Sequence, residues 1–241
     1  IPLRLVGSEM CIRDSAIRRQ VNMVYIIENN GTYGLTKGQF SATNDLDSKN
    51  KYGDDNLFKP IDLATMAIQL GATYVARSFS GDREQLIPLI MGAMQHKGFA
   101  LLDIISPCVT FNNHAASTKS YDYIREHNEA VGKTDFVPLG EEIKTSYDEG
   151  TSVEVNLHDG SKLSLEKTDK NFDPCDAGKS LNFMREKEKE GKVLTGLLYA
   201  DSTAKDLIET LNMTETPLNQ LDQDLICPGS KILDLINKDL S

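Results

Sequence analysis

Residues 24–39, VYIIENNGTYGLTKGQ, decide the fold. The stretch begins with an apolar run rich in β-branched residues, continues with the two amides Asn29 and Asn30, and ends in a loop that contains three glycines. This pattern predicts a buried parallel strand with a polar loop at its carboxyl end. In open α/β sheets ligands bind at that edge.

The residue types of this loop favour an anion held together with a hard cation. Glycines let the backbone approach a ligand closely, and amide and hydroxyl oxygens are ligands for such a cation. A diphosphate with magnesium is therefore the natural candidate. Taken alone, Asn30-Gly31 is also an ordinary turn, so the loop by itself leaves both interpretations open.

Further elements follow at the spacing of an α/β protein. Residues 40–59 form a long polar connection, which we expect to be functional and to cover a site. We expect Pro60 to open a helix over 61–70 that Gly71 ends, followed by a strand over 73–78. Asp82 is expected to cap the next helix, which ends at Lys97-Gly98. Its buried face is predicted to contain Leu86, Ile87, Leu89, Ile90, Ala93 and Met94.

The apolar run FALLDII, residues 99–105, is suited to a central strand. Alternating strands and helices predict an α/β fold, a parallel sheet with helices on both faces. The loop after this strand, residues 106–114, contains Cys108 and His114. If the two strands are neighbours, both polar loops line one crevice. His114 is expected to be a hydrogen-bonded loop residue rather than a general base.

The rest of the chain predicts a carboxyl-terminal extension that contains a β-hairpin. We expect a helix over 121–131, then a hairpin over 151–167 turning at Asp159-Gly160, with His158 solvated beside the turn. The charged run 185–192 is expected to be the exposed end of a helix, followed by a strand over 196–199 and a helix over 204–211. The expected division is therefore 1–15, 16–125 for the partial ligand-binding domain, and 126–241 for packing and subunit assembly.

Composition narrows the functional classes. The chain has 241 residues, 39% hydrophobic, and a formal net charge of −10, which argues against nucleic acid or anionic lipid as the main partner. No apolar run approaches the roughly 20 residues of a membrane span, and a soluble cytoplasmic protein is expected. The four cysteines lie far apart, so we expect buried thiols, with neither a disulfide framework nor a self-contained zinc site.

Two motifs together carry a resemblance to a known family. Asn29-Asn30 followed by GTYGLTKGQ resembles the second half of the thiamine diphosphate motif in β subunits of 2-oxoacid:ferredoxin oxidoreductases. The segment SPCVTFN, residues 106–112, is similar to the later cysteine segment of that family, and residues 195–199 to its closing region. The similarity covers nearly everything from Ala16 onward, and it implies a thiamine diphosphate-binding fold. Residues 1–15 instead resemble translated sequencing-adaptor read-through, with a short native helix as the alternative.

The resemblance implies specific ligands. Magnesium would bind the side chain of Asn30 and the backbone carbonyl of Thr32, and residues Gly34, Leu35 and Thr36 would cradle the diphosphate. Cys108 would be one ligand of a [4Fe-4S] cluster, because thiolates hold such clusters. In the family, three upstream cysteines complete the cluster and the aspartate of a GDG motif completes the magnesium site. This sequence has no counterpart of these four residues, which agrees with an amino-terminal truncation. The fragment itself is thus expected to be inactive.

The implied activity is oxidative decarboxylation of a 2-oxoacid. Coenzyme A takes the acyl group, electrons pass through the cluster to ferredoxin, and an α subunit supplies the rest of the site. The Lys37 form of the loop and the Asp159-Gly160 region look most like 2-oxoglutarate enzymes. Lys37 is the candidate catalytic residue, a cation for the second carboxylate of 2-oxoglutarate, although a solvent-facing lysine is the alternative. A pyruvate-specific relative, another thiamine diphosphate-dependent synthase or decarboxylase, and a non-enzymatic assembly subunit stay open.

Overall fold

The computed structural model describes residues 14–50, 52–115, 117–137, 152–156, 162–167, 172–214, 216–227 and 229–239. The chain divides into two compact units, Ile1–Leu207 and Ile208–Ser241, which are described separately. The first unit contains the sheet and the predicted site. The division expected from the sequence at residue 125 stays a prediction.

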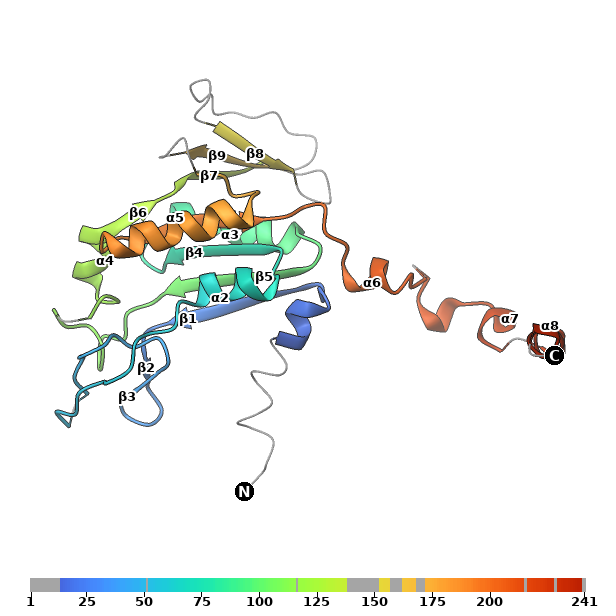
Figure 1. Ribbon diagram of the computed structural model, residues 1–241, viewed down its shortest axis with the longest axis horizontal. Coiled ribbons are helices and arrows are strands. Elements are labelled where there is room, and N and C mark those ends of the chain that lie inside the picture. Colours follow the sequence, from blue (N-terminus) through green and yellow to red (C-terminus); the bar gives the residue numbers. More distant parts are fainter. Residues whose placement is uncertain are drawn as a thin grey trace. The chain divides into compact units, whose positions relative to one another are not determined.

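The first unit is built on a five-stranded sheet with the strand order β1-β5-β4-β10-β6 (Figure 1). Its parallel part consists of β1 (Met23–Asn29), β5 (Phe99–Ile105) and β4 (Tyr74–Phe79). Strand β10 (Val193–Ala200) runs antiparallel to β4, and β6 (Asn128–Ala130) runs parallel to β10. The sheet is therefore mostly parallel, as the sequence predicts.

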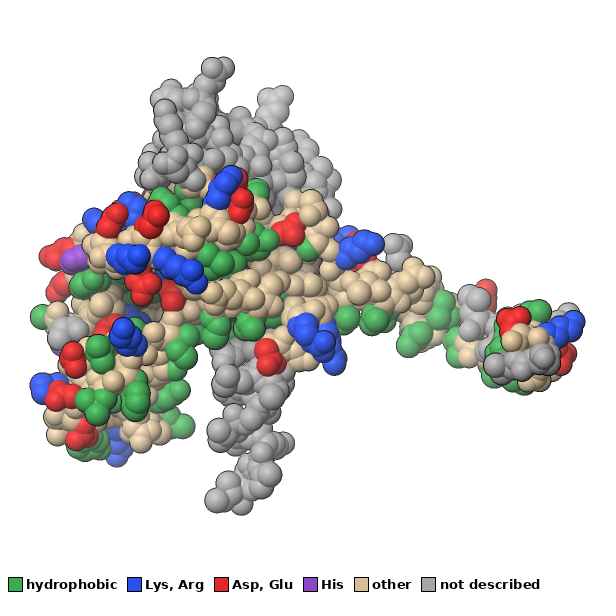
Figure 2. Space-filling model, viewed as in Figure 1, with side chains coloured by type: hydrophobic (Ala, Val, Ile, Leu, Met, Phe, Trp, Pro, Cys, Tyr) green, Lys and Arg blue, Asp and Glu red, His purple; other side chains and the backbone are tan. Residues whose placement is uncertain are grey.

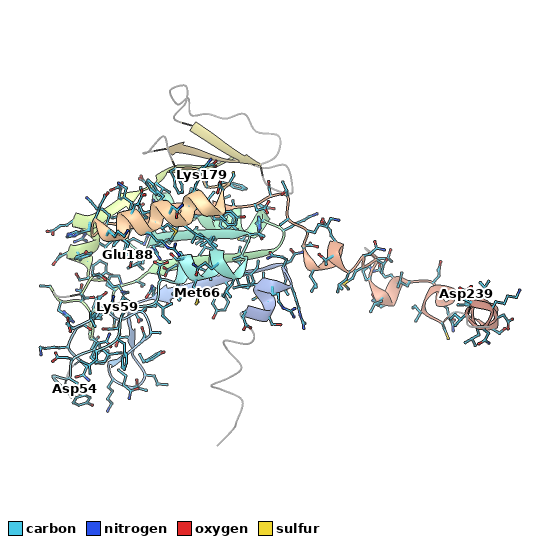
Figure 3. The ribbon with its side chains drawn as sticks, viewed as in Figure 1. Asp54, Lys59, Met66, Lys179, Glu188 and Asp239 are labelled. Atoms are coloured by element: carbon cyan, nitrogen blue, oxygen red, sulfur yellow. The ribbon has the colours of Figure 1, made fainter. Side chains whose placement is uncertain are left out.

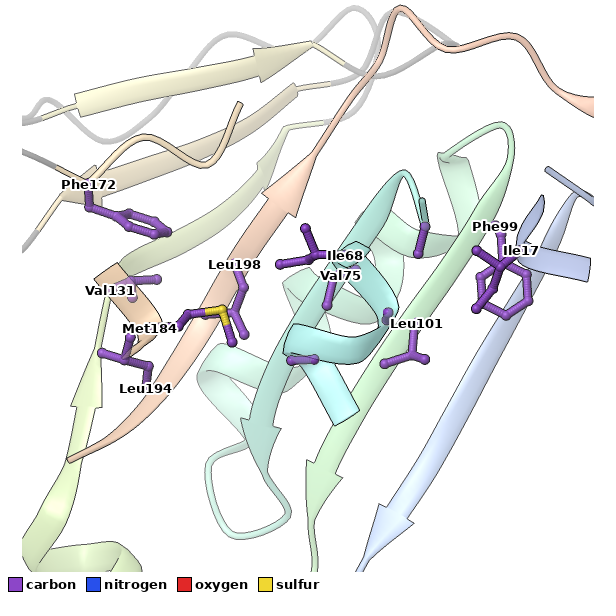
Figure 4. Close-up of a cluster of buried hydrophobic side chains, with 13 residues drawn as sticks. Ile17, Ile68, Val75, Phe99, Leu101, Val131, Phe172, Met184, Leu194 and Leu198 are labelled. Atoms are coloured by element: carbon purple, nitrogen blue, oxygen red, sulfur yellow. The ribbon is translucent and has the colours of Figure 1, made fainter. Parts of the chain in front are cut away.

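Helices cover both faces of the sheet. On one face, α2 (Leu63–Leu70) and α5 (Ala177–Lys189) pack against Val75, Phe99 and Leu101 through residues such as Ile68 and Met184 (Figure 4). On the other face, α3 (Arg83–Gln95) packs Leu89 and Ala93 against Tyr74, Ala100 and Leu102. Neighbouring residues of β4 and β5 thus face opposite layers, because side chains alternate along a strand.

The helix ends show which sequence signals act. The N-cap of α2 is Asp62, whose carboxylate accepts from the amide of Thr65, so the expectation that Pro60 opens the helix is wrong. Gly71 ends the helix with φ +93°, a left-handed conformation that favours glycine. Asp82 caps α3 as predicted, by accepting from the amide of Gln85. Proline ahead of a helix proves a weaker start signal than a carboxylate that can bond the free amides.

The predicted buried face of α3 is too wide. Leu86, Leu89, Ile90 and Ala93 belong to the core cluster on this side of the sheet, but Ile87 and Met94 are 55% and 69% exposed. The buried positions follow a spacing of three and four residues, which defines one stripe of a helix. Ile87 and Met94 lie outside that stripe, so assigning them to the core was wrong.

The predicted helix over 121–131 is shorter in the structure. Helix α4 spans Tyr121–His127 and is followed at once by β6. The amide of Val131 donates to the carbonyl of Thr195 at 2.8 Å, and residues 128–130 pair with β10. This pairing joins segments far apart in the sequence, so local periodicity gave no sign of it.

A second, three-stranded sheet contains β7 (Gly132–Val137), β9 (Lys162–Lys167) and β8 (Ser152–Asn156), in that order. Strands β8 and β9 are antiparallel, which confirms the predicted hairpin. Its turn at Asp159-Gly160 and His158 lie outside the described residues. Two short strands, β2 (Thr32–Tyr33) and β3 (Gln39–Phe40), pair within the glycine-containing loop.

The second unit consists of short helices. Residues 207–210 form α6 (Leu207–Thr210), shorter than the helix predicted over 204–211, and η1 (Leu218–Gln220), α7 (Gln223–Ile226) and α8 (Ser230–Asp239) follow. Within the part of the chain that the structure describes, no helix has the length and apolar character of a membrane span.

Figure 2 shows lysine and arginine side chains interspersed with aspartate and glutamate on the visible face of the molecule. Lys187, within the charged run 185–192, is only 18% exposed and pairs with Glu129.

Candidate functional site

The two adjacent asparagines at the end of β1 are held differently. Asn29 is 8% exposed, and its amide nitrogen donates to Asp103 Oδ1 at 2.9 Å. Its side-chain oxygen accepts from Thr43 Oγ1 at 2.7 Å. Asn30 is half-buried, and its side-chain oxygen accepts from the amide of Thr32 at 3.0 Å. Asn29 therefore anchors the end of the strand, while Asn30 shapes the turn that follows.

The turn is clamped by side chains from two other segments. Asn112 Nδ2 donates to the carbonyl of Asn30 at 2.8 Å, and Asn44 Nδ2 donates to the carbonyl of Gly31 at 2.6 Å. Gly31 has φ +70°, and a Cβ there would lie 2.6 Å from Asn112 Nδ2. Only glycine fits this position, which holds the turn in one conformation before any ligand binds.

The remaining loop residues of the predicted site project outward. Gly34, Leu35, Thr36 and Lys37 are exposed, and Leu35 is 97% exposed. Thr36 Oγ1 contacts the carbonyl of Tyr33 at 3.3 Å. Lys37 has φ +65°, which is uncommon for a residue other than glycine. The structure thus places Asn30 and Thr32 in a buried turn and the other four residues on the exposed side of the same loop.

The loop after β5 lies against this turn. Besides the bond from Asn112 to Asn30, the Phe111 ring packs so closely on Gly38 that an added Cβ would lie 3.0 Å from it. The two polar loops are therefore in contact, while the expectation that they line one crevice stays a prediction. Cys108 is partly buried, and its carbonyl accepts from the amide of Asn112 at 2.9 Å. His114 is exposed on the same loop.

The cysteines do not gather into a metal site among the described residues. Cys175 and Cys227 are exposed, so the expectation that each cysteine is a buried thiol is wrong for these two. No group of three or more histidine, cysteine, aspartate or glutamate residues in the described ranges is close enough to hold a metal ion. Among the described cysteines, only Cys108 lies on the loop whose Asn112 bonds the turn.

A buried ionic network behind Asn29 was missed by the sequence reasoning. Asp103 is fully buried on β5, and its Oδ2 accepts from Arg77 Nε at 2.8 Å. A second guanidinium nitrogen of Arg77 donates to Asp62 Oδ2 at 2.6 Å. The sequence did contain a signal, because Asp103 and Arg77 are the only charged residues in strands β5 and β4. Such a residue in a central strand must be paired when it is buried.

The charges of this network support one another. Burial alone would raise the pKa of Asp62, but Arg77 and the capping contact to Thr65 lower it below its ordinary value. Burial likewise disfavours the charged form of Arg77, yet the carboxylates of Asp62 and Asp103 more than offset this and raise its pKa. Asp62 and Arg77 therefore stay ionised in the folded protein at neutral pH.

The network borders a cavity of about 230 Å³ at the carboxyl ends of the parallel strands. Asn29, Thr43 and Lys119 also line it, and Lys119 Nζ pairs with Asp45 Oδ1 at 3.2 Å. The long polar connection after β3 supplies several of its walls. In Figure 3, Lys59 marks that connection and Glu188 marks the end of α5, from which Glu188 reaches the cavity. The expected role of the connection as part of a site is consistent with this position.

The fold and the clamped turn define a class of protein. Residues 13–104 match the family "Thiamine pyrophosphate enzyme, C-terminal TPP binding domain". This range contains β1, the Asn29-Asn30 turn and the strands β4 and β5 that support it. This segment of the chain therefore has the fold of thiamine diphosphate-binding domains.

Curated relatives narrow the class. The chain is 43% identical over 108 residues to "2-oxoacid:ferredoxin oxidoreductase subunit beta" of Saccharolobus solfataricus, a match covering 44% of this chain and 35% of the relative. It is 36% identical over 115 residues to "2-oxoglutarate oxidoreductase subunit KorB" of Mycobacterium tuberculosis, covering 46% of this chain and 29% of the relative. The chain is thus a homologue of β subunits of thiamine diphosphate-dependent 2-oxoacid:ferredoxin oxidoreductases. Its matches span about a third of the length of these relatives.

A solved structure agrees with this assignment. The 2-oxoglutarate:ferredoxin oxidoreductase from Magnetococcus marinus, with 2-oxoglutarate, coenzyme A and succinyl-CoA bound, is 27% identical to this chain with a TM-score of 0.59. The likeness covers 92% of this chain and 60% of that one. The similarity of fold therefore extends well beyond the segment that the family description matches.

Proposed function

We propose that this chain is the part of a 2-oxoglutarate:ferredoxin oxidoreductase β subunit that holds the magnesium diphosphate of thiamine diphosphate. The observation that carries the proposal is the turn Asn30-Gly31-Thr32, clamped by Asn112 from the loop that also contains Cys108. Other thiamine diphosphate-dependent enzymes would share the turn but have no reason to place a cysteine beside it.

The donor set of the turn suits magnesium. Asn30 has one side-chain oxygen with two lone pairs, of which the amide of Thr32 uses one. Together with the backbone carbonyl of Thr32, it would give two oxygen ligands, and Mg²⁺ usually shares its octahedral shell with phosphate and water. Glycine at position 31 lets the backbone approach a diphosphate without a side chain in the way.

The chemistry of the reaction belongs to the cofactor. Thiamine diphosphate, when bound, supplies the carbanion chemistry that oxidative decarboxylation requires. The residues of this chain hold and orient: Asn30 and Thr32 bind the metal, and residues 34–36 border the diphosphate. Lys37 would face the second carboxylate of 2-oxoglutarate once the α subunit covers the exposed loop. Cys108 would give one thiolate of a [4Fe-4S] cluster that passes electrons to ferredoxin, with the other three thiolates from outside the described residues.

Pyruvate is the alternative to 2-oxoglutarate as the substrate. Four curated relatives are called KorB, and each of their names contains 2-oxoglutarate. The solved structure contains 2-oxoglutarate and succinyl-CoA. The Saccharolobus relative is named only for 2-oxoacids, which leaves pyruvate as the alternative substrate.

The proposal is tested with the complex of this subunit and its α subunit, expressed from the intact genes. We expect reduction of a viologen dye that requires 2-oxoglutarate, coenzyme A, thiamine diphosphate and magnesium. Asn30→Ala should abolish turnover and weaken cofactor binding in calorimetry, because it removes a metal ligand. Asn50→Ala is the matched control, since Asn50 accepts from the amide of Tyr52 in a similar turn of an exposed loop. Wild-type cofactor affinity in the Asn30 variant would refute the metal-binding role.

A further inference from the structure

We infer that Asp103 is a positioning residue for the cofactor site, which acts by fixing the side-chain amide of Asn29. Arg77 Nε donates to the Asp103 carboxylate in the core, and Thr43 Oγ1 donates to the side-chain oxygen of Asn29 at the opposite end of the same amide. This inference rests on the proposed function, because it concerns how the metal-binding turn is aimed.

The first step is the geometry of the strand end. Asn29 is the last residue of β1 and lies opposite Ile105 in the register with β5, so its backbone still follows the strand. Side chains of successive residues in a strand point to opposite sides. Because Asp103 and Thr43 fix the Asn29 side chain at the end of the strand, the chain enters the Asn30 turn from a fixed direction.

The second step is the free-energy cost of burying the Asp103 carboxylate. A carboxylate with 0% exposure needs a charged partner, and β4 provides Arg77 at the register position opposite Asp103. An apolar pair of similar volume would stabilise the same core at least as well. What an apolar pair would not do is accept a hydrogen bond from Asn29 Nδ2. The specific consequence of Asp103 is therefore the orientation of that amide.

The third step separates Asp103 from its neighbour Asp62. Both carboxylates bind the same guanidinium, at 2.8 and 2.6 Å, but among the described contacts only Asp103 bonds Asn29. Asp62 instead caps α2 through the amide of Thr65. Removing the charge of Asp62 therefore disturbs the ionic network without touching Asn29, and asparagine at this position still caps a helix well.

The experiment measures binding of magnesium and thiamine diphosphate to the α–β complex by calorimetry, alongside the melting temperature. Asp103→Leu removes both accepting oxygens at similar volume and should raise the Kd for Mg²⁺ at saturating thiamine diphosphate by about 10- to 100-fold, the usual effect of losing an outer-shell partner. Thr43→Val removes only the other bond to Asn29 and should raise the same Kd by a smaller factor.

Two conservative variants separate positioning from charge. In Asp103→Asn the amide of Asn29 can rotate, so that its oxygen accepts from the new amide and its nitrogen donates to Thr43. This variant should bind the cofactor nearly as the wild type does, while its melting temperature falls. Asp62→Asn should also bind normally and melt earlier, because it too removes one carboxylate from Arg77.

Each outcome decides between the possibilities. Unchanged Mg²⁺ affinity in a folded Asp103→Leu complex overturns the inference, and so does a loss in Asp103→Asn as large as in Asp103→Leu, which would indicate a charge effect. If Asp103→Leu fails to fold, Thr43→Val decides, and normal affinity there overturns the inference. A wild-type complex that binds no thiamine diphosphate would instead refute the proposed function, and the positioning role with it.

Discussion

Gly31 is the residue on which the shape of the proposed metal-binding turn depends most directly. An alanine there would have φ +70° and a Cβ 2.6 Å from Asn112 Nδ2, so that the bond from Asn112 to the carbonyl of Asn30 must break. We expect Gly31→Ala to destabilise the protein by about 1–2 kcal/mol for the left-handed backbone alone, and by more for the clash. The measurement is the free energy of unfolding in urea.

Gly53 and Gly34 serve as controls for the Gly31→Ala variant. Gly53 also has a left-handed backbone, with φ +88°, but a Cβ there would meet nothing within 4 Å, so Gly53→Ala measures the backbone cost alone. Gly34→Ala has neither feature, since nothing lies within 4 Å and its φ is not positive. Equal losses in Gly31→Ala and Gly53→Ala would show that the contact with Asn112 does not constrain the turn.

Lys37 is the residue on which the substrate proposal depends. It is exposed in this chain, and it would have to pair with the second carboxylate of 2-oxoglutarate under the α subunit. Lys37→Ala in the complex should then cost about 2–5 kcal/mol in kcat/KM for 2-oxoglutarate, the penalty of leaving a buried charge without a partner. Turnover of pyruvate should be nearly unchanged, because pyruvate lacks that carboxylate.

The control for Lys37 addresses its backbone. Because φ is +65°, alanine is strained at this position, whereas asparagine tolerates a left-handed conformation. Lys37→Asn should therefore show the same substrate-specific loss as Lys37→Ala. Equal losses of kcat/KM for 2-oxoglutarate and pyruvate in these two variants would refute the pairing of Lys37 with the second carboxylate. They would indicate a general distortion of the loop instead.

At the scale of secondary structure, an ion pair links α2 to β4. Arg77 of β4 bonds Asp62, the N-cap of α2, at 2.6 Å. The pKa of Asp62 is lower in the folded protein than its ordinary value near 3.9, so its carboxylate stabilises the fold above that pH, and the contribution is lost as the pH falls through the folded value. We expect the melting temperature of the wild type to fall more steeply below about pH 4 than that of Asp62→Asn.

Measuring the melting temperature between neutral and strongly acidic pH tests this linkage. The difference between wild type and Asp62→Asn should be largest near neutral pH and shrink in acid, because protonation removes from the wild type what the substitution removes already. A constant difference across the range would contradict a titrating role of Asp62. The exposed carboxylate Asp54 lies in the long polar connection of residues 40–59 and offers Asp54→Asn as a surface control.

Secondary structure was predictable from the sequence wherever local signals sufficed. The run FALLDII gave strand β5 at its observed bounds, and Gly71 and Asp82 gave the end of α2 and the start of α3. Strand β6 was not predictable, because residues 128–130 adopt their conformation by pairing with β10 rather than through any local pattern. Such pairing has no signal in a short window of sequence.

The proposed site residues stay a prediction, whereas the contact between the two loops that contain them could be predicted. The order of the two motifs led to Asn30, Thr32 and Cys108, and the structure brings their two loops into contact through Asn112 and Phe111. The anchor behind them was not identified, because Asp103 and Arg77 meet across neighbouring strands whose register the sequence leaves open. Register depends on the whole sheet.

At the scale of the whole molecule, the chain supplies only part of each proposed metal site. Its matches span about a third of the length of its curated β-subunit relatives, and no group of three candidate ligands lies close together in the described ranges. A [4Fe-4S] cluster needs four thiolates, and Cys108 offers one beside the turn. A cluster at Cys108 would therefore need three more thiolates than the described residues bring together there.

The last prediction follows from that incompleteness. The α–β complex expressed from the intact genes should show the broad visible absorbance of an iron–sulfur cluster. Cys108→Ser in that complex should lose this absorbance while thiamine diphosphate still binds, because the proposed cofactor ligands Asn30 and Thr32 lie on a neighbouring loop. Cys175→Ser is the matched control, since Cys175 is exposed and in neither loop, and it should keep the absorbance. An intact cluster spectrum in Cys108→Ser would show that Cys108 is a packing residue and that the electron path from the cofactor runs elsewhere.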